Sequence, residues 1–122
     1  MLNSTFTQTI QVSENQTAIS LGSGTLPVFA TPALIALMEN TAMKLLSNLP
    51  EGDTSVGISM NMQHLKASPI GAFIECSATI SAIEGRKYTF TIKATDADGN
   101  LIGEGMHERV VVNIEKFMGK IK

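Results

Sequence analysis

The sequence predicts an α+β domain in which one long helix packs against a curved antiparallel sheet of five or six strands. Three observations predict it. A single stretch has helical periodicity over several turns, the residues after it alternate with the period of strands, and hairpin signals separate the alternating segments. A chain of 122 residues with 43% hydrophobic content fits one domain spanning residues 1–122.

The section Ser4–Leu21 is rich in Thr, Gln, Ile and Val, which predicts one or two strands. In the first of them, Phe6, Ile10 and Val12 are the candidates for the inner face. The run from Ala18 to Leu21 is the candidate for a second, short strand. The glycines of 22–24 then interrupt the pattern.

The long helix is predicted to begin at Thr31, with Thr31 as the N-cap and Pro32 in the first helical position, and to continue to Asn48. Residues 48–52 contain the Pro and Gly that end it. At about 100° per residue, one apolar stripe faces the core. Its predicted members are Ile35, Met38, Ala42, Leu45 and Leu46.

The remainder predicts a four-strand antiparallel meander. The first strand alternates with Val56, Ile58, Met60, Met62 and His64 on its inner face. The next two strands run from Ile74 to Ala82 and from Tyr88 to Ala94, and a long last strand runs from about Leu101 to Ile114. The segment 96–100 carries the Asp-Gly signal of a hairpin connection.

Charge and cysteine content exclude several classes of protein. Nine basic against eleven acidic residues give a net charge of −2, which provides no basic patch for nucleic acid or a membrane surface. A single cysteine, Cys76, excludes an internal disulfide, and with two histidines a metal cage is not expected. The first residues lack the pattern of a signal peptide or a transmembrane helix, so a cytoplasmic location is expected.

Glu39 is the residue whose position is most informative by itself. On the predicted helical wheel it lies between Ile35, Ala42 and Leu46, inside the apolar stripe. A carboxylate there is costly unless it is paired, hydrogen-bonded or protonated, and such placement is typical of a general base or nucleophile. The alternative is a carboxylate at the edge of the stripe that reaches solvent or a structural partner.

Two further residues are candidates for the same chemistry. Thr31 lies two turns before Glu39 on the same side of the helix, where its hydroxyl either caps the helix or assists developing negative charge. His64 lies in phase with the inner face of its strand and is either a core residue or a proton-transfer partner. Of the adjacent residues His107, Glu108 and Arg109, most are expected to be solvated or to contact a second subunit, and Cys76 is expected to be a small core residue.

Three blocks of the sequence together resemble a known family. These blocks are Val28–Glu39 (VFATPALIALME), Gly57–His64 (GISMNMQH) and Gly105–Val112 (GMHERVVV). In order and spacing they are similar to the fluoroacetyl-CoA thioesterase-like branch of the hotdog thioesterases. The similarity extends from about Val28 to Val112.

The resemblance implies a hotdog fold and hydrolysis of an acyl-CoA thioester by a catalytic set of Thr31, Glu39 and His64. It implies that Gly57 lies near the acyl group with its backbone N–H available, and that Arg109 lies near the substrate. It also implies a homodimer, or a dimer of dimers, with the acyl-CoA sites at the subunit interface. Water and a thioester suffice for this reaction, so no cofactor is expected beyond the CoA of the substrate.

The sequence departs from this branch at one point. Ser20–Pro27 contains no aromatic residue, whereas the fluoroacetyl-specialised enzyme has aromatic lid residues before the helix, so a short or medium acyl group is expected. The residues leave open whether Glu39 attacks the carbonyl or activates a water. Two other functions remain open, a hydratase or dehydratase acting on acyl thioesters and a non-catalytic acyl-CoA binding module.

Overall fold

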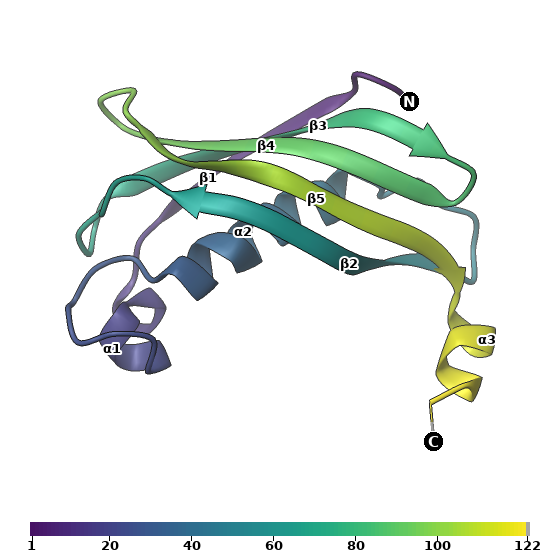
Figure 1. Cartoon of the computed structure of the whole chain (residues 1–122), viewed down its shortest axis with the longest axis horizontal. Helices are drawn as coiled ribbons and strands as arrows, with labels where there is room; N and C mark the ends of the chain where they lie inside the picture. The colour runs from purple at the N-terminus through teal and green to yellow at the C-terminus, as the bar shows by residue number, and fades with distance from the viewer. Residues whose placement is uncertain (122) are drawn as a thin grey trace.

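A curved antiparallel sheet arches over one long helix (Figure 1). The structure is a computed structural model that describes residues 1–121. Its strands are β1 (Thr5–Gln11), β2 (Asp53–His64), β3 (Phe73–Glu84), β4 (Lys87–Asp96) and β5 (Leu101–Asn113). Its helices are the 3-10 turn η1 (Glu14–Gln16) and the α-helices α1 (Ala18–Leu21), α2 (Thr31–Leu45) and α3 (Ile114–Gly119). The α+β architecture with one long helix and five strands is confirmed.

The order of the strands differs from the predicted meander. The sheet runs β1-β3-β4-β5-β2, so only β3, β4 and β5 are neighbours in chain order. Strand β2 pairs with β5 and forms one edge of the sheet, while β1 forms the other. The prediction was wrong here because alternation specifies which face a residue takes and not which strand lies beside it.

Helix α2 begins at Thr31, but Thr31 is its first residue and not its N-cap. Ala30 holds the N-cap position without a side-chain hydrogen bond, and the Thr31 hydroxyl is bonded to His64 instead. The helix ends at Leu45, one turn earlier than predicted. The face of α2 that packs against the sheet is also rotated from the predicted stripe. Its buried members are Ala33, Leu34, Leu37, Met38, Thr41 and Ala42.

This rotation places Ile35 and Glu39 on the flank of the buried face, where both are half-buried. The predicted and observed stripes have similar helical spacing, and contact with the sheet decides between them. Helix α2 also packs with its other flank toward β1, since Gln8 donates hydrogen bonds to Asn40 and Thr41. The flank that carries Glu39 faces β2, the free edge of the sheet.

The run Ala18–Leu21 forms the short helix α1 and not a strand. The Thr17 side chain accepts a hydrogen bond from the backbone N–H of Ser20, and Gly22 ends the helix with a φ of 72°. These are the ordinary start and stop of a helix, and four residues are too few for periodicity to distinguish a helix from a strand. At the other end of the chain, Ile114 is the first residue of α3 and not the last of a strand.

Strand β2 contains a bulge that reverses its pattern. The pairing with β5 skips Ile58, because Gly57 lies opposite Arg109 and Ser59 lies opposite Glu108. Ile58 is therefore 54% exposed, and Ser55 before the bulge is buried on the inner side. The predicted inner positions Val56 and Ile58 were wrong for this reason, since one inserted residue exchanges the two faces of a strand.

The core lies between α2 and the inner faces of β3, β4 and β5, and Cys76 is fully buried in it, as predicted.

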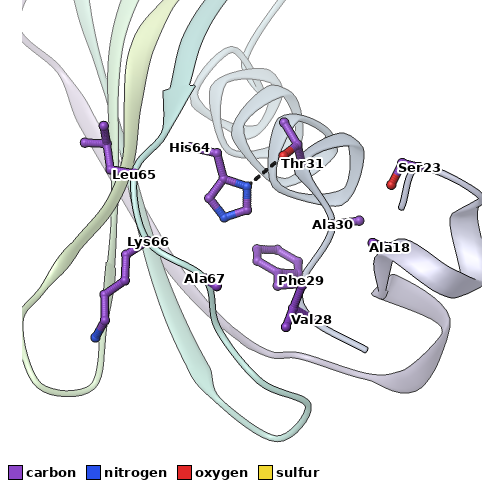
Figure 2. Close-up of a pocket in the computed structure, with 10 residues that line it drawn as sticks. All are labelled: Ala18, Ser23, Val28, Phe29, Ala30, Thr31, His64, Leu65, Lys66 and Ala67. Carbon is purple, nitrogen blue, oxygen red and sulfur yellow. Dashed lines mark hydrogen bonds between the residues drawn. The ribbon is translucent and has the colours of Figure 1, made fainter. Parts of the chain in front are cut away.

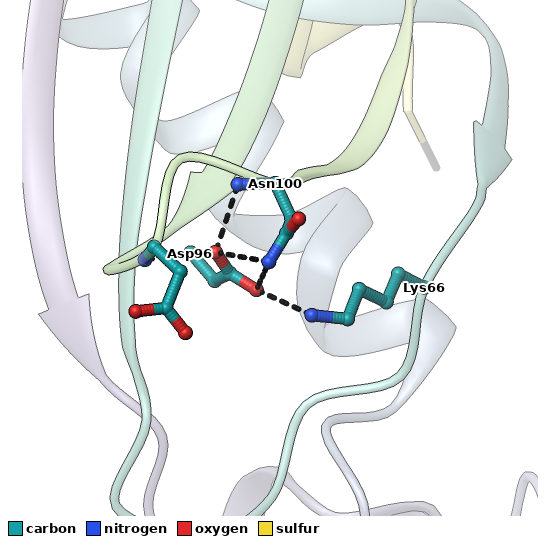
Figure 3. Close-up of polar contacts among 4 residues, drawn as sticks. Lys66, Asp96 and Asn100 are labelled. Atoms are coloured by element: carbon teal, nitrogen blue, oxygen red, sulfur yellow. Dashed lines mark hydrogen bonds and ion pairs between the residues drawn. The ribbon is translucent and has the colours of Figure 1, made fainter.

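The predicted β4–β5 connection is present. Its Asp96 carboxylate accepts a hydrogen bond from the backbone N–H of Asp98. It also accepts hydrogen bonds from Asn100 and pairs with Lys66 at 2.9 Å (Figure 3). In the described part of the chain, no helix is long and apolar enough to cross a membrane.

Candidate active site

Thr31 and His64 form a hydrogen-bonded pair at one end of α2. Thr31 lies in the first turn of α2, and His64 is the last residue of β2, which runs beside that helix. The Thr31 Oγ1 and His64 Nδ1 atoms are 2.8 Å apart (Figure 2). The ring of Phe29, itself buried, contacts the imidazole edge-on with the ring centroids 6.4 Å apart. Residues at the start of α2 and just before it, Thr31 and Phe29, thus orient the His64 ring.

The other ring nitrogen of His64 has no partner. Its Nε2 atom is buried and makes no hydrogen bond within residues 1–121. Burial lowers the pKa of the His64 imidazole below its usual range, and the backbone of Lys66 acts in the opposite direction. His64 is therefore neutral at pH 7, with one nitrogen oriented by Thr31 and the other available for proton transfer.

A pocket of about 310 Å³ adjoins this pair. Figure 2 shows it between residues 28–31, residues 64–67, and Ala18 and Ser23 of the α1 region. The segment that precedes α2 thus forms one wall and the connection after β2 forms the other. A small group placed here would lie against the Thr31 hydroxyl and the His64 ring.

Glu39 lies beside Gly57, more than two turns along α2 from Thr31. A Cβ atom at Gly57 would be 2.8 Å from Oε2 of Glu39 and 3.4 Å from Nη1 of Arg109. The missing side chain of Gly57 therefore makes room for the carboxylate and the guanidinium at the same place. Glu39 is half-buried, so its carboxylate keeps access to solvent on the β2 side.

Arg109 and His107 are both buried, at 7% and 0% exposure, which corrects the expectation of a solvated role for them. They lie on the inner face of β5, which has β4 on one side and β2 on the other. Glu108 points the other way and pairs with Lys87 at 3.5 Å. The signal that could have found the buried pair is that positions 107 and 109 continue the inner-face alternation of β5.

Arg109 is held by hydrogen bonds to β2 and to its neighbour on β5. Its Nε donates to Ser55 Oγ at 2.8 Å and its Nη2 donates to the Ser55 carbonyl at 3.0 Å. Its Nη1 lies 3.1 Å from His107 Nε2. Burial lowers the pKa of Arg109, and the nearby Glu39 carboxylate opposes this shift.

The structure brings the five predicted site residues together in two groups and not in one. Thr31 and His64 form the first, and Glu39, Gly57 and Arg109 form the second. Eight residues of helix separate Thr31 from Glu39 by about 12 Å. Along β2, seven residues separate Gly57 from His64 by about 23 Å. Within one chain, Glu39 and His64 therefore do not reach a common substrate atom.

No three His, Cys, Asp or Glu side chains within residues 1–121 are placed so that they could hold a metal ion together. The chemistry that the two groups offer is that of acids and bases. The first group supplies a hydroxyl and an oriented imidazole, and the second supplies a carboxylate beside a buried cation.

Comparison with known proteins identifies similar chains. Residues 12–115 match the family described as fluoroacetyl-CoA-specific thioesterase. The fluoroacetyl-CoA thioesterase of Streptantibioticus cattleyicolor is 33% identical over 96 residues, which cover 78% of this chain and 68% of the relative.

Solved structures of similar proteins have the same fold as this chain. A crystal structure of a mutant fluoroacetyl-CoA-specific thioesterase superposes with a TM-score of 0.93 at 29% identity, covering 99% of this chain and 94% of that one. A hypothetical protein of Thermus thermophilus, a thioesterase superfamily member, superposes with a TM-score of 0.91 at 23% identity, covering 98% and 89%. The expected hotdog fold is confirmed.

Proposed function

Since this chain belongs to the fluoroacetyl-CoA-specific thioesterase family, we propose that it hydrolyses an acyl-CoA thioester with a short or medium acyl group to the free acid and CoA. The observation that carries the proposal is the Thr31–His64 pair, in which a buried, neutral imidazole has one nitrogen oriented and the other unpartnered. A structural histidine would have both nitrogens satisfied. Family membership supplies the reaction in which such a group acts.

In this reaction a C–O bond forms at the carbonyl carbon, the C–S bond breaks, and the CoA thiolate takes up a proton. Glu39 either takes a proton from the attacking water or attacks the carbonyl itself, giving an anhydride that water then cleaves. His64 handles the proton that reaches the leaving thiolate, and Thr31 orients the His64 ring. The backbone N–H of Gly57 and the Arg109 cation stabilise negative charge on the carbonyl oxygen.

We further propose that the complete site forms between two copies of this chain. Strand β2 is an edge strand whose outer side has no neighbour in the sheet, and unpaired edges are templates for pairing with another chain. Ile58, which the bulge turns away from the core, projects from this strand with 54% of its surface exposed. An apolar side chain exposed on a free edge fits a contact with a second subunit.

Antiparallel pairing of two β2 strands would also unite the two groups. If the two-fold axis passes near Met60 and Asn61, the His64 end of one strand lies opposite the Gly57 end of the other. The Thr31–His64 pair of one protomer then faces Glu39 of the partner subunit. A homodimer therefore supplies two complete sites, each built from both chains.

The acyl preference follows from the segment before α2. Residues 20–27 contain no aromatic side chain, and Ser23 of this segment lines the pocket, where Phe29 is the aromatic residue of the wall. A pocket of about 310 Å³ suits a short or medium chain.

The test is release of free thiol from a panel of acyl-CoAs of increasing chain length. We expect Glu39→Gln and His64→Ala each to lower kcat by about 100- to 10,000-fold. The exposed Glu75 on β3 provides a matched control, because Glu75→Gln removes the same charge at a distance from both groups. Saturable binding of acyl-CoA without thiol release would favour a binding module, and a change in unsaturation without release would favour a hydratase.

A further inference from the structure

His107 is a buried titratable residue to which the proposed reaction gives no role. It lies on β5 opposite Met60 of β2 and Phe90 of β4, and none of its surface is exposed. Its ring stacks on Phe90 with centroids 6.0 Å apart and the planes 29° from parallel. This contact fixes the plane of the imidazole.

The hydrogen bonds of His107 also fix its protonation. Nδ1 lies 2.8 Å from the backbone carbonyl of Ser59, and a carbonyl can only accept, so Nδ1 carries the proton. Nε2 faces Nη1 of Arg109 at 3.1 Å, and a guanidinium can only donate, so Nε2 offers its lone pair. His107 is thus a neutral imidazole in one tautomer. Burial and the charge of Arg109 lower the pKa of His107, while the Ser59 carbonyl, Glu39 and Glu108 raise it less.

The β2 bulge makes this arrangement possible. Ile58 is the inserted residue, and the Ser59 carbonyl that follows it accepts from the His107 ring. On the other side of the bulge, Ser55 accepts two hydrogen bonds from Arg109. The guanidinium is therefore held on two sides by neutral acceptors, with His107 in contact with the Nη1 end.

Nη1 is the end of Arg109 that approaches Glu39. The position that a Cβ atom would take at Gly57 is 3.4 Å from Nη1 of Arg109 and 2.8 Å from Oε2 of Glu39. Nη1 carries two N–H groups, and His107 accepts one of them. Within residues 1–121 the second makes no hydrogen bond, so it remains for an acyl oxygen placed beside Glu39. A rotation of the guanidinium would move this cation away from the carboxylate.

From these contacts we propose that His107 is a positioning residue, which holds Nη1 of Arg109 beside the Glu39 carboxylate by accepting its hydrogen bond as a neutral imidazole. The proposal rests on the proposed function, because it assigns His107 to the half-site that contains Glu39. Protonation of His107 would remove the acceptor and bring a second positive charge next to Arg109.

Two amide variants separate the two nitrogens of His107. In His107→Gln the amide group reaches the position of Nε2 and its oxygen accepts from Arg109. In His107→Asn the amide group occupies the position of Nδ1, so it bonds to the Ser59 carbonyl but does not reach Arg109. Both replace a buried ring by a smaller amide, so both lose the stacking on Phe90.

We expect kcat to fall by about 10- to 100-fold in His107→Asn with little change in KM, because a hydrogen bond to a charged group is lost. His107→Gln should retain a kcat at least about tenfold higher than His107→Asn. A merely structural role predicts instead that the two variants lose activity in proportion to their loss of stability, which urea unfolding measures. Equal kcat in the two folded variants overturns the proposal.

Nitrogen NMR of the wild-type protein gives a second test that requires no variant. The proposal predicts that the His107 ring at pH 7 is neutral with its proton on Nδ1. A protonated ring, or the opposite tautomer, overturns it. A wild-type protein that releases no thiol from any acyl-CoA contradicts the proposed function, and the NMR spectrum still decides whether the His107–Arg109 arrangement exists.

Discussion

A methyl group added at Gly57 would meet both the Glu39 carboxylate and the buried His107 ring. In Gly57→Ala the new Cβ atom would lie 2.8 Å from Oε2 of Glu39, whereas ordinary contact begins at 3.4 Å. The carboxylate must therefore move by about 0.6 Å or more. The Glu39 carboxylate is the end of a flexible side chain and can move, but the new Cβ atom would also lie 3.1 Å from Cε1 of the buried His107 ring, which would have to shift by a few tenths of an ångström.

Catalysis should not tolerate the same displacement. A reacting group misplaced by about 1 Å costs on the order of 100-fold in rate, so we expect kcat to fall by about 10- to 100-fold. The free energy of unfolding should fall by about 1 to 2 kcal/mol, because the contact with the packed His107 ring costs stability, while alanine lowers the entropy of the unfolded chain and offsets part of that cost. Thiol release and urea unfolding of the same preparation measure the two quantities.

Two other glycines provide controls. Nothing lies within 4 Å of a Cβ at Gly119, so Gly119→Ala should change neither activity nor stability. At Gly105 the new atom would meet the backbone carbonyl of Asn61 at 2.5 Å, and Gly105→Ala should destabilise the fold. A Gly57→Ala variant with unchanged kcat would refute the reasoning that the Glu39 carboxylate must occupy the space over Gly57.

Three further predictions concern pH, the hairpin and the cysteine. Burial lowers the pKa of His64, so its neutral form persists below the ordinary value of 6.5. The fall of kcat/KM on the acid side of the pH profile should therefore lie below that pH. A fall at or above pH 6.5 contradicts the role of His64. Lys66, together with Asn100, holds the pKa of Asp96 well below its usual range, so its contribution to stability is present above the ordinary value of 3.8 and is lost as the pH falls toward the folded value. Urea unfolding should therefore show wild type more stable than Asp96→Asn at pH 7, with the difference shrinking at about pH 2.5; a difference that stays the same at both pH values contradicts this role of Asp96. Burial raises the pKa of the Cys76 thiol, so a thiol reagent should label Cys76 only in denaturant; labelling of the native protein would show that this part of the core opens.

The sequence was sufficient to predict the long helix and the strands of the sheet because their signals are local, whereas the short helices α1 and α3 were missed. The periodicity after Thr31 and the alternation in residues 74–82 and 88–94 each describe a segment that buries one face. Strand order was not predictable in the same way, since β2 has the same pattern whether it pairs with β3 or with β5. That choice depends on how the connections cross the sheet.

The contacts of the site were less predictable than its residues, because they join residues that are far apart in the sequence. Thr31 and His64 lie 33 positions apart in the sequence, and the pattern alone left both with ordinary structural explanations. The bulge at Ile58 determines the contacts of Ser55, Ser59 and His107. No residue type in β2 indicates that a residue is inserted there. Family resemblance supplied the site residues, whereas the hydrogen bonds around Arg109 required coordinates.

Mixing two inactive variants tests the central claim, that the active site combines residues of two chains. His64→Ala retains Glu39, and Glu39→Gln retains the Thr31–His64 pair. When the two proteins are unfolded together and refolded in equal amounts, half of the dimers should contain one copy of each variant. Each mixed dimer then has one complete site and one with both defects.

Thiol release by the refolded mixture should therefore recover to about a quarter of the wild-type rate, while each variant refolded alone stays inactive. If instead each site lay within a single chain, no mixed dimer would contain an intact set. A mixture that remains as inactive as its two components, although mixed dimers have formed, would contradict the composite site.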